Sequence, residues 1–208
     1  MILRIAREEN KLEDVERICI FKSTETFDQL RKNKLVKEDA LLFINSIASV
    51  SLNDEDRTRF HHYFSHIQSQ IVVEVTEEEN MSEEALIRKR ETKGFSGMFA
   101  LDDYGSGYNT EINLLNLSPK YIKIDLTIVR NIDKDFDKQQ LVSNIVEYAH
   151  QREGYIIAEG IETKEELLKV LELGVDYLQG YYLSYPQLNP QEVSNESIKT
   201  IENYWKKR

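Results

Sequence analysis

Short apolar runs alternate with amphipathic stretches along most of this chain. Apolar residues recur at three- and four-residue spacing within residues 3–31, which predicts one or two helices before the first strand. From there the order strand, helix, strand repeats up to a final helix that ends near Trp205. The predicted strands are residues 41–44, 71–75, 98–101, 121–126, 155–158 and 177–183, and the predicted helices between them are residues 56–68, 82–93, 138–150 and 163–174.

One of these helices carries signals at both ends. Thr163 can accept a hydrogen bond from the backbone three residues on, where Glu166 can reach back to it, and this reciprocal arrangement is a capping box. Gly174 suits the left-handed conformation that closes many helices. The helix therefore begins after Thr163 and ends before Gly174.

Alternating strands and helices predict a parallel sheet, either open and doubly wound or closed as a (β/α) barrel. The Gly-x-Gly-x-x-Gly turn that marks a dinucleotide-binding open sheet does not follow the first strand. The length of 208 residues, without a composition break, is normal for a single α/β barrel domain over residues 1–208. We therefore expect an α/β fold of the TIM-like barrel type.

A polar residue stands at or near the C-terminal end of every predicted strand. These residues are Asn45, Glu74, Asp102 with Asp103, Lys123 with Asp125, Glu159 and Gln179. In a parallel barrel the carboxyl ends of the strands converge on one mouth, which is where barrel enzymes place their active sites. The pattern therefore predicts one shared site.

The residue types in this set suit divalent cations. Carboxylate and amide oxygens are the ligands that Mg²⁺ or Mn²⁺ prefers, and the neighbouring Asp102 and Asp103 repel each other unless cations lie between them. Two metal ions are a common device for phosphoryl chemistry, so we hypothesise a two-metal site. Lys123 and Asp125 share strand parity and are expected to face the same way. Glu159 is the candidate base.

Taken singly, several of these residues have simpler interpretations. Asn45 could be a turn or cap residue, Gln179 a satisfied polar side chain, and Lys123 with Asp125 an ordinary ion pair. Consecutive carboxylates at the end of a buried strand are harder to explain without charge compensation. The segment that follows, Gly105-Ser106-Gly107, reads as a loop shaped around a ligand.

Charge and composition restrict the partners. A formal net charge of -10 argues against a nucleic-acid polymer, because such binding needs a basic surface. Cys19 is the single cysteine, so an intramolecular disulfide is impossible and a buried thiol in a reducing cytosol is expected. No apolar run approaches the roughly 20 residues of a membrane span. We therefore expect a cytoplasmic location.

Six segments, in order, resemble the EAL family of bacterial cyclic di-GMP phosphodiesterases. They are residues 43–46 (Phe-Ile-Asn-Ser), 73–77 (Val-Glu-Val-Thr-Glu), 101–108 (Leu-Asp-Asp-Tyr-Gly-Ser-Gly-Tyr), 122–125 (Ile-Lys-Ile-Asp), 158–163 (Ala-Glu-Gly-Ile-Glu-Thr) and 179–181 (Gln-Gly-Tyr). The resemblance implies a modified TIM barrel of EAL type that hydrolyses cyclic di-GMP to the linear dinucleotide pGpG with Mg²⁺ or Mn²⁺.

The resemblance also implies roles for individual residues. It makes Asn45, Glu74, Asp102 and Asp103 metal ligands, with Asp102 bridging both ions. It places Lys123 beside the attacking water, makes Glu159 the general base or a water-orienting carboxylate, and makes Gln179 a contact from the last strand. Asp125, Glu162, Gly105, Ser106 and Gly107 belong to the same motifs and are expected to support the site or the substrate. Glu77 matches the glutamate that steadies the loop after Asp103, a loop that the family links to dimerisation.

The chain departs from the family pattern at its start. The Glu-x-Leu-x-Arg strand that should precede residues 3–8 is absent, and with it one metal ligand, so we expect an incomplete barrel and doubtful activity for this chain by itself. A catalytically inactive EAL-like module that binds cyclic di-GMP or a protein partner is the alternative, and another Mg²⁺-dependent barrel enzyme is a weaker one. A homodimer and companion sensory or cyclase domains in a longer protein are also expected.

Overall fold

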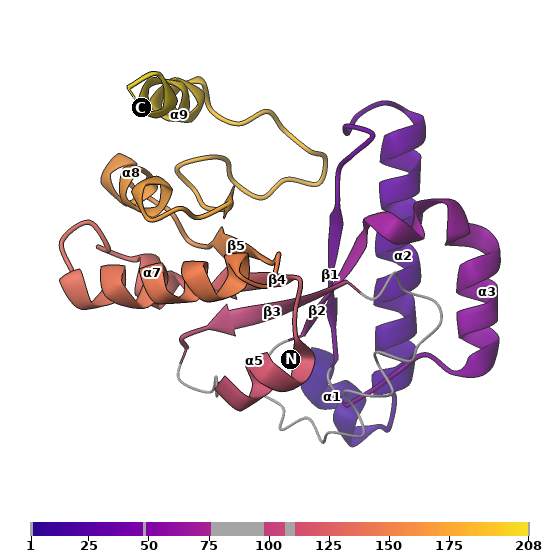
Figure 1. The fold of residues 1–208 in the computed structure, drawn as a ribbon. Coiled ribbons are helices and arrows are strands. Elements are labelled where there is room, and N and C mark those ends of the chain that lie inside the picture. The colour runs from indigo at the N-terminus through magenta and orange to yellow at the C-terminus, as the bar shows by residue number, and fades with distance from the viewer. Residues whose placement is uncertain (1, 48, 76–97, 107–110, 208) are drawn as a thin grey trace. The chain divides into compact units, whose positions relative to one another are not determined.

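The computed structural model describes residues 2–47, 49–75, 98–106 and 111–207 (Figure 1). Contacts between Cα atoms divide the chain into two compact units. The first comprises Met1–Leu101 and Thr110–Pro119, and the second comprises Asp102–Asn109 and Lys120–Arg208. Strand β3 (Phe99–Tyr104) begins in the first unit and ends in the second. A single domain over residues 1–208 stays a prediction.

The first unit is built around one long helix. Helix α2 lies between strand β1 and helix α3 (Figure 1). Besides the start of β3, its described elements are α1 (Ile2–Glu8), α2 (Leu12–Lys32), β1 (Leu42–Ser46), α3 (Asp54–Phe64), a 3₁₀ helix η1 (Ser65–Gln70), β2 (Ile71–Val75) and α5 (Glu111–Leu117). The prediction of one or two helices within residues 3–31 is thus confirmed, because α1 and α2 cover this stretch.

A hydrophobic core holds this unit together. Residues at three- and four-residue spacing on α2 turn one face inward, which brings Ile20 and Phe27 against the aromatic face of α3. Phe60 and Phe64 of α3 are buried there, and Phe60 meets the edge of Phe21 at a ring separation of 5.5 Å. Burial of such aromatic and aliphatic side chains is the main stabilising contribution to a core of this kind.

The second unit continues the alternation of strands and helices. Helix α7 packs on β4 and β5, and α8 lies between α7 and α9 (Figure 1). Besides the end of β3, its described elements are β4 (Tyr121–Ile124), α6 (Leu126–Val129), α7 (Phe136–His150), β5 (Tyr155–Ala158), α8 (Lys164–Glu172), β6 (Tyr177–Leu178) and α9 (Asn195–Lys206). Thr163 and Glu166 form the predicted capping box at the start of α8, and Gly174 has the predicted positive φ, 87°.

The strands are hydrogen-bonded in the order in which they occur along the chain, from β1 to β6. The pairs β1–β2, β2–β3, β4–β5 and β5–β6 are parallel, with Asn45 opposite Glu74 and Lys123 opposite Ile157. A doubly wound open sheet reverses its strand order at a switch point, whereas a barrel wall keeps sequential order. The sequential order therefore favours the predicted barrel type of α/β fold over the doubly wound open sheet.

Several boundaries differ from the prediction. Asp102 and Asp103 lie within β3 rather than after it, β4 stops before Asp125, and β6 is two residues long. Helices α5 and α6 were not predicted, residues 65–70 turn more tightly as η1, and the helix predicted for residues 82–93 lies outside the described residues. The thiol of Cys19 is exposed, so its predicted burial is wrong. Among the described helices, none is long and apolar enough to cross a membrane.

Candidate functional site

Two aspartates near the end of strand β3, Asp102 and Asp103, differ in their backbone conformation. Asp102 is buried at 8% exposure, while Asp103 has a φ of 57°, in the left-handed region that a residue other than glycine rarely adopts. Successive side chains of a regular strand point to opposite faces, and the left-handed turn at Asp103 interrupts that alternation. Its carbonyl oxygen then accepts a hydrogen bond from Ser106 N at 3.0 Å, which closes the turn after the strand.

Lys123 from β4 lies between carboxylates from two other strand ends. Its Nζ atom is 2.8 Å from Asp102 Oδ1 and 2.8 Å from Glu159 Oε1, and the three side chains are 8%, 11% and 14% exposed. Glu159 directly follows β5, and its backbone N–H donates to Ile124 O of the neighbouring strand. Parallel pairing of β4 with β5 therefore places the ammonium and the carboxylate at the same end of the unit.

The three carboxylates can hold a cation. One oxygen each from Asp102, Asp103 and Glu159 lies within 4.8 Å of the other two. Opposite ligands of a six-coordinate ion are about 4.2 Å apart for Mg²⁺ and nearer 5 Å for Ca²⁺, so small side-chain adjustments would suffice. One ammonium faces three carboxylates among these four side chains, which leaves negative charge for a divalent ion to neutralise.

The buried Oδ1 atom of Asp102 supports the same fit. It lies 2.8 Å from the Lys123 ammonium, and the same ammonium contacts Glu159. One ammonium shared by two carboxylates leaves acceptor lone pairs on these oxygens, so the donor set and its geometry fit a divalent cation.

Asn45 and Glu74 belong to the first unit, where they are paired. They stand opposite each other at the carboxyl ends of β1 and β2, Asn45 exposed and Glu74 buried at 6% exposure. An amide oxygen and a carboxylate on adjacent strands form the same kind of oxygen-donor pair that hard cations prefer. The structure thus brings together two subsets of the predicted ligands, one in each unit.

Asp125 lies outside the strand that carries Lys123. The strand ends at Ile124, and Asp125 caps the short helix α6, where its Oδ1 accepts hydrogen bonds from Thr127 N at 2.8 Å and Thr127 Oγ1 at 2.5 Å. Strand alternation would make Asp125 face the same way as Lys123 only if β4 continued through Asp125. Because the strand stops earlier, Asp125 supports the turn after Lys123 by capping it.

Gln179 follows β6, and its backbone is hydrogen-bonded to residues on both sides of Glu159. Its N–H donates to Ala158 O at 2.9 Å, and its carbonyl accepts from Ile161 N at 3.1 Å. Gly180 is required beside it, since a Cβ atom there would lie 2.2 Å from the carbonyl oxygen of Ile161. The loop after β5 and the segment after β6 are therefore closely packed, and the Gln179 side chain itself is exposed.

The remaining predicted residues lie in the flanking turns. Gly105, with a φ of 99°, follows β3 where a Cβ atom would overlap Ile128, and Ser106 is exposed. Glu162 pairs with Arg130. Glu77 and Gly107 lie outside the described residues.

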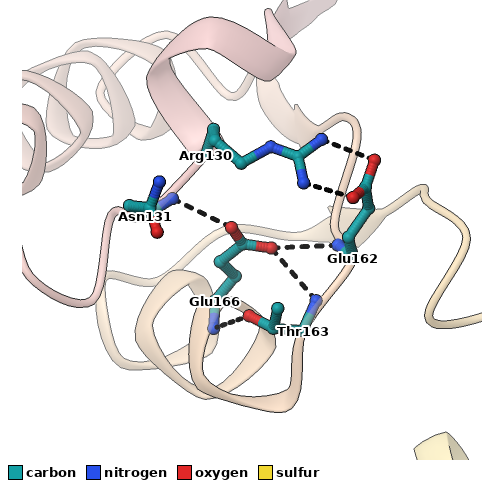
Figure 2. Close-up of polar contacts among 5 residues, drawn as sticks. All are labelled: Arg130, Asn131, Glu162, Thr163 and Glu166. Atoms are coloured by element: carbon teal, nitrogen blue, oxygen red, sulfur yellow. Dashed lines mark hydrogen bonds and ion pairs between the residues drawn. The ribbon is translucent and has the colours of Figure 1, made fainter.

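Sequence reasoning missed a polar network that anchors the Glu159 loop, which Figure 2 shows. Both terminal guanidinium nitrogens of Arg130 donate to the Glu162 carboxylate, and this ion pair holds the pKa of Glu162 below its usual value. Glu166, at 1% exposure, accepts from Asn131 N at 2.9 Å and from the N–H groups of Glu162 and Thr163 at 2.9 and 3.1 Å. The capping-box pattern was the signal for Glu166, but nothing in the sequence indicated Asn131.

These bonds have an electrostatic consequence for Glu166. Burial raises the pKa of its carboxyl, but the hydrogen bonds from the backbone of Asn131, Glu162 and Thr163 outweigh burial and hold that pKa below its usual value. Glu166 is therefore a carboxylate that ties the loop after β5 to the turn after α6.

Comparisons with known proteins agree with this geometry. The family model described as "EAL domain" matches residues 1–186. Among curated proteins, the Escherichia coli cyclic di-GMP phosphodiesterase PdeF is 33% identical over 57% of this chain and 16% of its own length, and E. coli PdeL is 42% identical over 42% of this chain and 24% of its own length. The aligned stretches thus span less than a quarter of these relatives.

Solved structures show the same fold. BlrP1 of Klebsiella pneumoniae, in complex with calcium and cyclic di-GMP, is 25% identical with a TM-score of 0.72 over 89% of this chain and 47% of that chain. The manganese and cyclic di-GMP complex of the same protein is 26% identical with a TM-score of 0.69 over 84% of this chain and 45% of that chain. With the family model covering most of its residues, this chain belongs to the EAL domain family.

Proposed function

We propose that this chain forms the core of a phosphodiesterase that hydrolyses cyclic di-GMP to linear pGpG in bacterial second-messenger signalling. The observation that carries the proposal is the placement of Lys123 Nζ at 2.8 Å from both Asp102 and Glu159. Asp103 adds a third carboxylate to this cluster. Cyclic di-GMP phosphodiesterases among the relatives, and EAL structures that hold cyclic di-GMP with metal ions, support the choice of substrate.

The site is proposed to use Mg²⁺ or Mn²⁺. Asn45, Glu74, Asp102 and Asp103 would supply the oxygen ligands of these ions. When bound, such ions polarise the phosphodiester and lower the pKa of a water molecule. The oxygen donors on β1, β2 and β3 are of the type that both metals accept.

Lys123 and Glu159 would perform the proton and charge chemistry. The Lys123 ammonium lies 2.8 Å from both carboxylates, from where it can donate hydrogen bonds to water or to a phosphate oxygen and offset the developing negative charge. Glu159 would accept a proton from the attacking water while the water oxygen forms a bond to phosphorus. One P–O ester bond to a ribose breaks, and the departing oxygen takes up a proton, which gives the linear dinucleotide.

The other residues would hold these groups in place. Glu162 and Asp125 fix the turns that follow Glu159 and Lys123, as their bonds to Arg130 and Thr127 indicate. Gln179 is assigned a substrate contact from the segment after β6. Gly105, Ser106, Gly107 and Glu77 are assigned to the loop after β3 and its support.

The test is cyclic di-GMP turnover with Mn²⁺ or Mg²⁺, followed by ion-exchange chromatography of pGpG. We would compare this chain with a form extended upstream through a Glu-x-Leu-x-Arg strand. Glu159→Gln should reduce turnover by about 10²–10⁴-fold in the active form, since it removes the base. Glu147→Gln, at an exposed position of α7, is the matched control and should keep full activity.

The outcomes separate the candidate functions. Cleavage that Glu159→Gln abolishes supports the phosphodiesterase. Binding of cyclic di-GMP without cleavage by both forms would instead favour an EAL-like module that binds the dinucleotide or a protein partner. Neither binding nor cleavage, with turnover of another phosphoester, would overturn both.

The cellular setting is part of the proposal. A bacterial, cytoplasmic location follows from an intracellular second messenger as substrate, and the bacterial relatives support it. Companion domains are proposed because the relative MucR is a bifunctional diguanylate cyclase and cyclic di-GMP phosphodiesterase. A homodimer is proposed from the family resemblance of the loop after β3, and light scattering after size-exclusion chromatography would measure it.

A further inference from the structure

Helix α2 carries a carboxylate on its core-facing side. The buried positions of this helix are Glu16, Ile20, Thr24, Phe27 and Asp28, spaced as one helical face. Glu16 is 3% exposed and occupies a position where an apolar residue would continue the packing of Ile20 and Phe27. Burying a carboxylate is unfavourable unless hydrogen bonds compensate it, so its partners are informative.

Glu16 is bonded to Ser46, the last residue of strand β1, and to Ile47, which follows the strand. Its Oε1 accepts a hydrogen bond from Ser46 Oγ, and its Oε2 accepts from Ile47 N at 2.8 Å. The Glu16 carboxylate thus accepts hydrogen bonds from the side chain of one residue and the backbone of the next, an arrangement called here the Glu16 grip on Ser46 and Ile47. These bonds to a charged acceptor are stronger than neutral ones, so the end of β1 is held firmly against α2.

The residue immediately before this grip is Asn45. Neighbouring strand residues point to opposite faces, and the burial pattern agrees, with Ser46 buried toward the helix and Asn45 exposed on the other face. Fixing Ser46 and Ile47 therefore fixes the direction of the Asn45 side chain. It also maintains the register in which Asn45 stands opposite Glu74.

We propose that Glu16 is a positioning residue that orients Asn45 for metal binding from behind the strand. The inference rests on the proposed function, because it takes Asn45 as a metal ligand. Residues that hold a ligand in place are worth about 10–100-fold in metal affinity or activity in other metalloproteins, although they do not touch the ion. Glu16 has the burial and the two hydrogen bonds that such a role requires.

The experiment compares two substitutions at Glu16 in the folded chain. Glu16→Leu keeps the side-chain bulk but removes both acceptors. Glu16→Gln can still accept from Ile47 N with its carbonyl and donate to Ser46 Oγ with its amide. Glu13→Leu, at an exposed position of the same helix, is the matched control. Mn²⁺ affinity is measured by electron paramagnetic resonance titration, and hydrogen exchange of the Ile47 amide reports whether the grip is intact.

We expect Glu16→Leu to weaken Mn²⁺ binding by about 10–100-fold and to expose the Ile47 amide to exchange, with Glu16→Gln and Glu13→Leu within about threefold of wild type. Unchanged Mn²⁺ affinity in Glu16→Leu, while Asn45→Ala loses it, would overturn the inference and leave the proposed function standing. Equal affinity in wild type and Asn45→Ala would instead overturn the ligand role of Asn45, and the inference with it.

Should Glu16→Leu fail to fold, Ser46→Ala provides the same test. It removes one of the two donors at the end of β1 and leaves the backbone bond of Ile47 in place. A severalfold loss of Mn²⁺ affinity, with the circular dichroism spectrum unchanged, supports the positioning role. Wild-type affinity in folded Ser46→Ala overturns it.

Discussion

Asp102 and Asp103 follow each other on strand β3, yet both offer a carboxylate oxygen to the same cluster with Glu159. The left-handed backbone at Asp103, with a φ of 57°, makes this compatible with a strand. Strain of this kind at a cluster of charged groups is common at functional sites. Aspartate and asparagine tolerate the conformation better than other residues that carry a Cβ atom.

Replacement of Asp103 should separate charge from backbone strain. Asp103→Asn and Asp103→Ala both remove one negative charge, but asparagine accepts the left-handed region more readily. We therefore expect Asp103→Ala to be less stable than Asp103→Asn by about 1 kcal/mol in urea unfolding without metal. Both should lose Mn²⁺ affinity. Equal free energies of unfolding for the two variants would contradict the role assigned to the backbone.

Removal of the ammonium at Lys123 should destabilise the chain in a metal-dependent way. Lys123→Met leaves the carboxylates of Asp102 and Glu159 facing each other in a site that is 8–14% exposed. We expect a loss of about 3–5 kcal/mol in the free energy of unfolding without metal. Added Mn²⁺ should restore part of it, because the cation supplies the missing positive charge.

Two further variants check this explanation. Lys164→Met, at an exposed position, should stay within about 0.5 kcal/mol of wild type. The double variant Lys123→Met with Glu159→Gln should be more stable than Lys123→Met alone, since one of the unbalanced charges is gone. A loss that neither Mn²⁺ nor the second substitution reduces would point to packing instead of charge.

The hydrogen bonds of Glu166 should make the difference in free energy of unfolding between wild type and Glu166→Gln depend on pH. Its folded pKa is lowered, chiefly because bonds from the backbone of Asn131, Glu162 and Thr163 outweigh burial. The unfolded chain therefore binds more protons in the acidic range, and the stabilisation is present above the unfolded pKa of about 4.3 and lost as pH falls through the folded pKa. Glu166→Gln should cost about 1–3 kcal/mol at neutral pH.

The measurement is urea unfolding of wild type and Glu166→Gln at neutral pH and below pH about 4. The difference between the two proteins should shrink at the lower pH. Glu165→Gln, an exposed neighbour in the first turn of α8, serves as the control. A difference that is the same at both pH values would show that the Glu166 carboxylate gains nothing from its charge.

The opposite end of the second unit carries a group that titrates at alkaline pH. Burial, followed by the nearby Tyr177 and Tyr155, raises the pKa of Tyr121 to about 12. Its stabilising contribution is therefore complete below the unfolded pKa of about 10 and is lost as pH rises toward 12.

Tyr121→Phe should remove this pH dependence. Between pH about 10 and 12 the stability of wild type should fall more steeply than that of the variant, as followed by circular dichroism and phenolate absorbance. An alkaline slope that the substitution leaves unchanged would mean that Tyr121 ionises as readily in the folded chain as in the unfolded one.

Most of the regular structure could be predicted from the sequence because its signals are local. The apolar periodicity that marks α2, and the Thr163 and Glu166 pair that starts α8, act over a few residues and appear where predicted. The end of β4 was placed too late, since Asp125 has the polarity of a site residue. Its bond to Thr127 is a local alternative that an apolar run does not reveal.

By itself, the sequence determined the family, the order of strands and helices, and which carboxylates stand at strand ends, because these follow from motifs and periodicity along the chain. Tertiary structure decided which groups meet. The contact of Lys123 with two carboxylates depends on parallel pairing across β4 and β5, and the grip of Glu16 on Ser46 joins residues 30 apart in sequence. Contacts between residues so far apart in sequence form only when the chain folds back on itself, so no local pattern could specify them.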